Sequence, residues 1–243
     1  ETDHFIVFTD WDAREFNFLK THLERAYSIV SRQFDIPAKE NVFVGKLPVY
    51  MWSKYAAFKK YASEMDDFPV SERVAGYYSG NNRGVGHMSM WKPTSELTGT
   101  SSIKDAETLW GYVLVHEFTH AFVARYRTNE RIPRWMNEGI AEVIAMGQVP
   151  MTGHYSIARR MAQEKVNIDV IFDDDTMPSG NYYPVMQTMV ELLVNKGRKN
   201  FIAMIDAIKD GTEPEAALKQ FYKLDYAGLT KEWRDYAVRL SKN

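Results

Sequence analysis

The stretch from Tyr112 to Ala124 contains His116, Glu117 and His120 in the spacing H-E-x-x-H. Residues four apart lie one above the other on the same face of a helix, so both imidazoles can bind one metal ion. Glu117 is about 100° round the helix from His116. Its carboxylate therefore projects beside the pair, where a general base for a water molecule has to be. The spacing predicts a zinc site suited to hydrolysis.

The third metal ligand has to come from outside this stretch. A catalytic zinc site uses three protein ligands and leaves one position open, and the chain has no cysteine, so the third ligand must be histidine or a carboxylate. The longer pattern H-E-x-x-H-x-x-G-x-x-H fails, because Val123 and Tyr126 stand where its glycine and last histidine would be. Glu138, on the next predicted helix, is the better candidate.

Glu138 is followed one helical turn later by Glu142, on the same face of the predicted helix. Glu142 can accept a hydrogen bond from the ring nitrogen that a ligand histidine does not offer to the metal. An exposed acidic stripe on a surface helix would give the same spacing. The surrounding apolar residues favour a buried helix, in which a metal removes the cost of burying a carboxylate. These residues are Trp135, Met136, Ile140 and Ile144.

Two motifs together, His116–His120 and Trp135-Met-Asn-Glu-Gly-Ile-Ala-Glu142, resemble the gluzincin class of zinc metallopeptidases. Within that class the peptidase MA-like group is the most similar. The resemblance is specific in these two motifs and extends weakly over the whole chain. It implies one catalytic zinc ion held by His116, His120 and Glu138, with Glu117 as general base and Glu142 as the hydrogen-bond partner of a ligand histidine.

The resemblance also implies a residue that stabilises the oxyanion formed during hydrolysis, because gluzincins commonly use a tyrosine or histidine there. Tyr183 is the residue expected in that role, with Tyr182 and His87 as alternatives. A Gly-x-Met-Glu-Asn strand, which in related aminopeptidases binds a free substrate N-terminus, is absent, and Gly84-Val-Gly-His-Met-Ser-Met90 stands in its place. This departure favours an endopeptidase.

The elements that must position these residues begin with alternating strands and helices. Residues 4–10 and 42–52 read as strands, with Pro48 marking an irregularity or an edge. Residues 12–34 read as a helix, and 53–63 as a shorter one. Residues 74–79 and 85–91 read as a hairpin joined by a turn rich in Gly and Asn. The hairpin could present an edge to an extended ligand or could serve the fold alone. A polar loop at 94–102 precedes the predicted metal-binding helix, residues 104–125, which Ser102 is expected to cap.

The rest of the chain reads as helical. The helix that carries Glu138 begins near Pro133, and later helices are predicted over 154–164, 183–195, 198–209, 213–221 and 226–241. The acidic run 173–175 lacks the alternating ligands of a calcium loop and is interpreted as a surface turn. The predicted fold is α+β and zincin-like. An N-terminal lobe, residues 1–127, would hold a mixed sheet and the active-site helix, packed against a mainly helical C-terminal lobe, residues 128–243.

Composition narrows the class of protein. The chain has 243 residues, 45% hydrophobic and 14% aromatic, as in a globular protein with a full core. A formal net charge of −2 gives no indication of nucleic acid or an anionic membrane as partner. No apolar run has the length of a membrane span. The expected partner is a peptide or protein substrate.

Two other hypotheses remain open at this point. A zincin-like domain could have become a binding module for peptide or glycan without turnover, although an intact Glu117 argues for an enzyme. A helical structural protein could carry the motif by chance, and would then hold no stoichiometric zinc. The chain begins at Glu1 and not at methionine, which suggests either a trimmed sequence or a mature, processed form. An extracytoplasmic or secreted location is the expectation in the second case.

Overall fold

The computed structural model describes residues 1–71, 74–80, 86–92, 103–149, 152–176 and 180–240. It separates into two compact units, Glu1–Tyr126 and Arg127–Asn243. The predicted hairpin turn after Gly80 and the predicted polar loop with the Ser102 cap lie outside the described residues. The mixture of sheet and helices confirms the α+β class predicted from the sequence.

The first unit is built on a four-stranded mixed sheet with the order β1-β2-β4-β3. β1 runs parallel to β2, β2 runs parallel to β4, and β3 pairs antiparallel with β4 as the predicted hairpin. Among the described strands β3 therefore lies at an edge of the sheet. The strands are β1 (Phe5–Thr9), β2 (Leu47–Trp52), β3 (Gly76–Gly80) and β4 (Gly86–Trp91).

Of the two alternatives for Pro48, an irregularity or an edge, the edge is wrong, because β2 lies in the interior of the described sheet. Pro48 is the second residue of β2 and is in register with Ile6 of β1. The ladder between β2 and β4 begins only at Val49, which is in register with Met88. At Pro48 the strand is thus paired on one side only, so a residue without an N–H is tolerated there.

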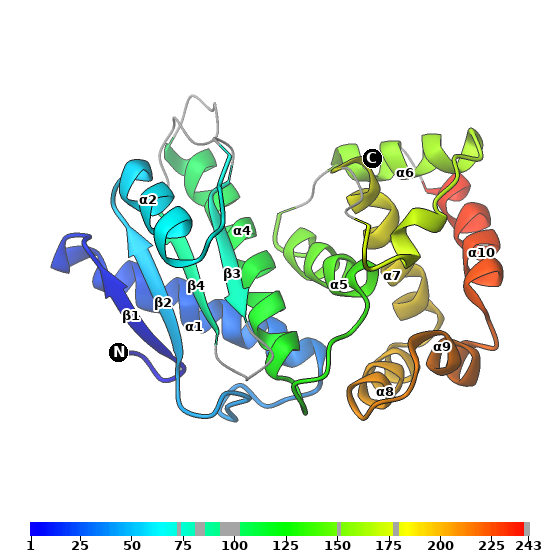
Figure 1. The fold of residues 1–243 in the computed structure, drawn as a ribbon, viewed down its shortest axis with the longest axis horizontal. Helices are drawn as coiled ribbons and strands as arrows, with labels where there is room; N and C mark the ends of the chain where they lie inside the picture. The colour runs from blue at the N-terminus through cyan, green and yellow to red at the C-terminus, as the bar shows by residue number, and fades with distance from the viewer. Residues whose placement is uncertain (72–73, 81–85, 93–102, 150–151, 177–179, 241–243) are drawn as a thin grey trace. The chain divides into compact units, whose positions relative to one another are not determined.

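Helices cover both faces of this sheet. Figure 1 shows α2 on one face and α1 and α4 on the other. The aromatic rings of Phe118 and Phe122 on α4 pack against Tyr27 of α1, and Phe118 also contacts Phe5 of β1. A short 3₁₀ turn, Ala13–Glu15, precedes α1. The helices of this unit are α1 (Phe16–Gln33), α2 (Tyr55–Met65) and α4 (Ile103–Arg125).

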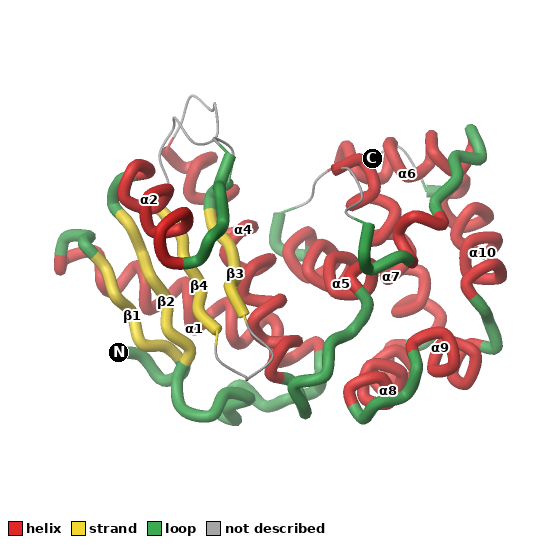
Figure 2. Tube along the Cα trace, in the orientation of Figure 1, coloured by secondary structure: helices red, strands yellow, loops and turns green. Residues whose placement is uncertain are grey.

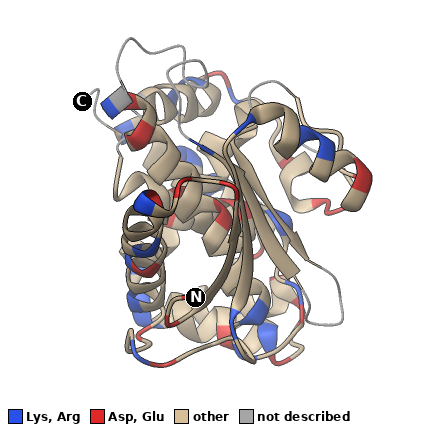
Figure 3. Cartoon of the chain, turned by 90° about the vertical axis from the view of Figure 1, so that its left-hand side faces the viewer, with Lys and Arg blue, Asp and Glu red and all other residues tan. Residues whose placement is uncertain are grey.

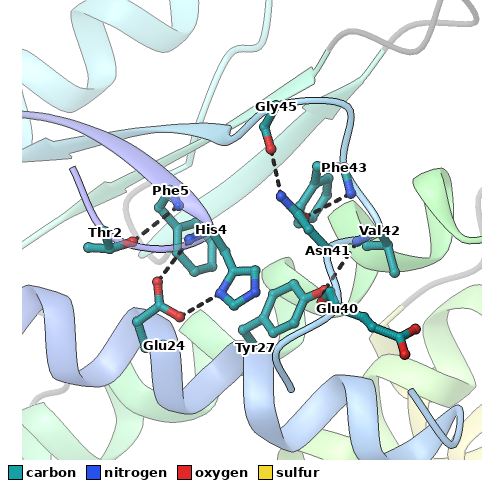
Figure 4. A network of polar contacts seen from close by, with 10 residues as sticks. All are labelled: Thr2, His4, Phe5, Glu24, Tyr27, Glu40, Asn41, Val42, Phe43 and Gly45. Carbon is teal, nitrogen blue, oxygen red and sulfur yellow. Dashed lines mark hydrogen bonds and ion pairs between the residues drawn. The ribbon is translucent and has the colours of Figure 1, made fainter. Parts of the chain in front are cut away.

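A polar network ties the start of β1 to α1 (Figure 4). Glu24 accepts hydrogen bonds from the main-chain N–H of His4 and, at 2.6 Å, from Nδ1 of its ring. The His4 ring is stacked on Tyr27 with a centroid distance of 3.5 Å. The hydroxyl of Tyr27 donates to the carbonyl of Glu40 and accepts from the N–H of Val42. This network holds the strand and the following loop against the helix that packs on α4.

The second unit contains helices and no strand among its described residues (Figure 2). α5 packs on α7, and α10 is joined to α7 by a hydrogen bond from Trp233 Nε1 to Thr188 Oγ1. The helices are α5 (Arg134–Met146), α6 (Thr152–Gln163), α7 (Tyr183–Lys196), α8 (Arg198–Lys209), α9 (Pro214–Tyr222) and α10 (Tyr226–Arg239). Two 3₁₀ turns, Asp169–Phe172 and Gly180–Tyr182, lie between α6 and α7.

Charged residues of both signs occur along the helices drawn in Figure 3. This distribution agrees with the small net charge of −2. None of the helices in the described part of the chain combines the length and the hydropathy that a bilayer span requires.

Candidate metal centre

His116 and His120 lie four residues apart on α4, and their Nε2 atoms are 3.2 Å from one another. The two rings are nearly perpendicular, with an interplanar angle of 86°. Two nitrogens bound at 2.0–2.1 Å to one tetrahedral zinc ion would be about 3.3 Å apart. The same distance also suits a hydrogen bond between the rings, in which one nitrogen carries the proton. The separation of the pair is therefore compatible with two ligands of one zinc ion.

The rotation of α4 about its axis is set by the opposite face of the helix. Trp110, Phe118 and Phe122 are fully buried there, and Trp110 Nε1 donates a hydrogen bond to the carbonyl of Trp91 in β4 at 3.0 Å. With these rings fixed in the core, the face that carries His116 and the other polar residues is left only half-buried. The core thus presents the imidazoles at a partly accessible surface.

Glu117 is held by the edge strand of the sheet. Its Oε2 accepts a hydrogen bond from the main-chain N–H of Tyr78 in β3 at 3.0 Å. This contact directs the carboxylate toward β3 and restricts its rotamers. The general base predicted from the motif is therefore positioned by a strand that is distant in the sequence.

Tyr78 itself was missed by sequence reasoning, which treated the residue only as part of a strand. Its ring lies across two glycines: a Cβ added to Gly80 or Gly86 would stand 2.6 Å or 2.4 Å from the Tyr78 hydroxyl oxygen. Burial raises the pKa of Tyr78, and the charge of Arg125 opposes this rise. The pair of glycines beside a tyrosine in a predicted hairpin was the available signal, since strand glycines often mark a close approach.

Glu138 and Glu142 lie on α5, as predicted, with Glu138 half-buried and Glu142 only 5% exposed. The helix approaches α7 closely at Gly139, where an added Cβ would stand 2.5 Å from the carbonyl oxygen of Met186 and from Cγ2 of Val190. The glycine of the Asn-Glu-Gly motif thus allows the contact that fixes α5 on α7. Glu138 lies in the second unit, whereas the histidine pair lies in the first.

His154 is a further residue that sequence reasoning missed. On α6, its Nδ1 lies 3.7 Å from Oε2 of Glu142, and both side chains are largely buried. The separation suits an ionic contact more than a direct hydrogen bond. A histidine 12 residues after a glutamate carries no signal in the sequence, because the two residues lie on different helices and only the packing of these helices sets their distance.

The candidates for oxyanion stabilisation occupy different surroundings. Tyr183 is the first residue of α7, and Tyr182 precedes it with its hydroxyl 3.3 Å from the carbonyl of Asn167. His87 Nε2 lies 2.9 Å from Asp66 Oδ2, and its ring contacts Tyr61 of α2. Successive strand residues point to opposite faces, so His87 faces α2 whereas α4 covers the other face. This arrangement separates His87 from Glu117.

The chain was compared with known families and proteins. A family model described as the Peptidase MA superfamily matches residues 94–239. The match covers more than half of the chain, and the helices α4 and α5 lie entirely within it. A comparison with curated proteins gives no match.

Proposed function

The chain belongs to the Peptidase MA superfamily, and on this basis we propose that it is a zinc-dependent metallopeptidase of the gluzincin type with a zincin-like fold. Membership supports a peptidase in general terms and a peptide substrate, and the superfamily is typically zinc-dependent. The observation that carries the proposal is the 3.2 Å separation of the two Nε2 atoms of His116 and His120. That separation matches two ligands of one tetrahedral ion.

The proposed ligand set is His116, His120 and Glu138. Two imidazoles and one carboxylate are donors that zinc commonly takes in hydrolases, and the chain offers no thiolate as a competitor. When bound, zinc would act as a Lewis acid that polarises a carbonyl group and lowers the pKa of water. Glu142 would hold a ligand histidine in the required tautomer by accepting its second N–H.

Glu117 would act as the general base and then as the general acid. Its carboxylate takes a proton from the attacking water and later delivers that proton to the leaving amine. The hydrogen bond from the Tyr78 N–H to Oε2 fixes the orientation of this carboxylate. Tyr183 would donate its hydroxyl proton in a hydrogen bond to the oxyanion, and Tyr182 is the alternative for this role.

Cleavage within a peptide chain is proposed in preference to removal of a terminal residue. An edge strand can add an extended substrate through main-chain hydrogen bonds, without needing a free terminus. β3 is such an edge strand and is in direct contact with Glu117. The Gly-x-Met-Glu-Asn segment of related aminopeptidases is missing from the sequence.

The proposal is tested by measuring bound zinc and turnover on the same preparation. Elemental analysis should give one zinc ion per chain. The protein should cleave a peptide library at internal bonds, and a chelator should abolish this cleavage. Stoichiometric zinc without turnover would support instead the binding module for peptide or glycan. Absence of zinc at neutral pH would overturn the proposed metal site.

A further inference from the structure

The carboxylate of Asp66 joins the end of α2 to the hairpin of β3 and β4. Asp66 directly follows α2 as its C-cap. Its Oδ2 accepts a hydrogen bond from the hydroxyl of Tyr77 in β3 at 2.5 Å and lies 2.9 Å from Nε2 of His87 in β4. An ionised carboxylate only accepts hydrogen bonds, so Nε2 of His87 is a donor here. One oxygen atom thus connects three elements of the first unit.

These three side chains are largely buried. The side chain of Asp66 is 8% exposed and that of His87 is 20% exposed, while Tyr77 as a whole residue is 7% exposed. Burial and the hydrogen bond to Asp66 raise the pKa of Tyr77, so its hydroxyl stays protonated and donates. Burying a carboxylate is costly even when it is paired, and apolar residues often fill the same space without loss of stability. The presence of Asp66 here therefore requires an explanation other than packing.

β3 is the element that a tether of this kind would restrain most. Among the described strands it lies at the edge of the sheet and pairs with β4 alone. The strand has five residues, with Gly76 and Gly80 at its two ends, and glycine weakens a strand. The side chain of Tyr77 adds a restraint from α2, because its ring packs on Phe58 and its hydroxyl is bonded to Asp66.

The residue next to Tyr77 contacts the proposed base. The main-chain N–H of Tyr78 donates to Oε2 of Glu117 at 3.0 Å. A single planar peptide group contains both the Cα of Tyr77 and this N–H, so a shift of Tyr77 also moves the donor. Figure 1 shows α2 and α4 on opposite faces of the sheet. The contacts therefore form a continuous path from α2, through the edge strand, to a carboxylate on α4.

We propose that Asp66 is a positioning residue for the general base Glu117. It acts through two neighbouring residues of β3: Tyr77, which its carboxylate holds, and Tyr78, whose N–H orients the base. His87 is the second donor that keeps the Asp66 carboxylate in place, on the face of the sheet away from α4. The effect on catalysis rests on the proposed peptidase function, whereas the restraint on β3 does not.

Another interpretation of Asp66 is that it contributes only to the packing of α2 on the sheet. Its replacement would then lower the stability of the first unit as a whole. Amide hydrogen exchange would rise alike in β1 and β3, and turnover by the folded chain would stay unchanged. The two experiments below separate this interpretation from the proposal.

The first experiment measures amide hydrogen exchange by mass spectrometry on the full chain, and it needs neither substrate nor turnover. Tyr77→Phe removes only the hydroxyl that donates to Asp66, Asp66→Ala removes the carboxylate, and Asp66→Asn keeps an acceptor oxygen. Exchange in β3 should rise about 10-fold in Tyr77→Phe and in Asp66→Ala, because a hydrogen bond to a charged group contributes about that factor. It should rise less in Asp66→Asn, and β1 should exchange at the wild-type rate in all three variants.

The second experiment measures turnover and bound zinc on the same preparations. Tyr77→Phe and Asp66→Ala should lower kcat about 10-fold, since a misplacement of about 1 Å at a reacting group can cost up to about 10²-fold. KM and bound zinc should stay near their wild-type values. In a chain that already carries Glu117→Gln, the same replacements should lower the residual kcat no further, because the group that they position is absent.

Two matched variants serve as controls. Asp10→Asn changes a carboxylate that accepts hydrogen bonds from the N–H and the hydroxyl of Ser53, just before the other end of α2. Tyr222→Phe removes a buried tyrosine hydroxyl that donates to the carbonyl of Leu193 in the second unit. Neither residue forms a hydrogen bond with β3 in the described part of the chain. Both variants should therefore keep the wild-type exchange of β3 and the wild-type kcat.

The outcomes distinguish the two proposals. Unchanged exchange of β3 in Tyr77→Phe and Asp66→Ala, or an equal rise in β1, overturns the restraint. Faster exchange of β3 with unchanged kcat, or a further loss in the Glu117→Gln chain, overturns the link to the base. A wild type that cleaves no peptide refutes the peptidase function and with it that link, while the exchange data still decide whether Asp66 restrains β3. Tyr77→Phe preserves the test should Asp66→Ala not fold, as circular dichroism would show.

Discussion

The main-chain N–H of Tyr78 donates a hydrogen bond to Oε2 of Glu117 at 3.0 Å. This contact joins an edge strand of the sheet to the residue proposed as general base. Because the donor belongs to the main chain, replacement of the Tyr78 side chain leaves the contact in place. The orientation of the carboxylate thus depends on the position of β3 and not on the identity of the residue.

The role of Glu117 is tested by replacing it with glutamine, which keeps its size and a hydrogen-bond acceptor. We expect Glu117→Gln to lower kcat by about 10²–10⁴-fold, since general acid–base catalysis contributes that much. Bound zinc should stay at the wild-type level, because Glu117 is not a proposed ligand. Full chelator-sensitive activity in this variant would contradict the role of Glu117.

Removal of zinc should lower both activity and stability. A ligand that binds only the folded chain stabilises it by about 2.7 kcal/mol at a free concentration 100 times its Kd. We therefore expect the melting temperature to fall on dialysis against a chelator and to recover when zinc is added. The variant His120→Ala should show neither the zinc-dependent shift nor the recovery. An equal shift in that variant would place the zinc elsewhere.

Glu142 is tested through the affinity for zinc. Loss of a carboxylate that supports a ligand histidine typically weakens metal binding about 10–100-fold. We expect Glu142→Gln to weaken zinc binding by a factor in that range. Competition with a chromogenic chelator measures the affinity. The matched control is Glu191→Gln on α7, a carboxylate that accepts hydrogen bonds from Tyr155 and Tyr236. That control should bind zinc as the wild type does, and an equal loss would point to a general effect on the fold.

The close contact at Gly139 predicts a loss of stability in Gly139→Ala. The added methyl group would stand 2.5 Å from the carbonyl oxygen of Met186, and main-chain atoms cannot move aside cheaply. Overpacking of this kind costs about 1–3 kcal/mol. Gly111→Ala on α4 is the control, since an added Cβ there meets nothing within 4 Å. It should be neutral or stabilising by about 0.5–1 kcal/mol, as urea denaturation would show.

The network around Glu24 predicts a dependence of stability on pH. Burial acts to raise the pKa of Glu24, but hydrogen bonds from Thr2 and His4 lower it, and the net pKa lies below its ordinary value. A carboxyl group with a depressed folded-state pKa stabilises the fold above its unfolded-state pKa. This contribution is lost as the pH falls through the folded-state value.

Glu24→Gln should therefore reduce the unfolding free energy near neutral pH, and the difference from the wild type should shrink as the pH falls through the folded-state pKa of Glu24. Denaturation at a series of pH values measures this difference. The control is Glu64→Gln, an exposed residue 4.0 Å from Lys60, which should show little change at any pH. A difference for Glu24→Gln that is constant with pH would contradict the electrostatic explanation.

Much of the fold follows from local patterns in the sequence. The period of the apolar residues predicted α4 and α5 to within a few residues, and the alternating runs predicted β3 and β4 as a hairpin. These patterns are reliable because the residues on one face of a helix or a strand recur in the sequence at the period of that element. The order of the strands has no such local signal, and for that reason the sequence could not distinguish an edge from an irregularity at Pro48.

The sequence by itself determined the chemistry that this protein can offer. The spacing of His116, Glu117 and His120 specifies two imidazoles on one helical face with a carboxylate beside them, because helix geometry converts spacing into direction. The motif around Glu138 supplied a third donor of a suitable type, and its place in a metal site remains a proposal.

Only the tertiary structure decided which distant groups surround that chemistry. The Tyr78 N–H beside Glu117, His154 beside Glu142 and the separation of His87 from α4 depend on the strand order and on the packing of the helices. The same is true of Asp66, whose carboxylate joins α2 to β3 and β4. Contacts between segments far apart in the chain arise from the packing of whole elements, and no spacing of residues encodes them.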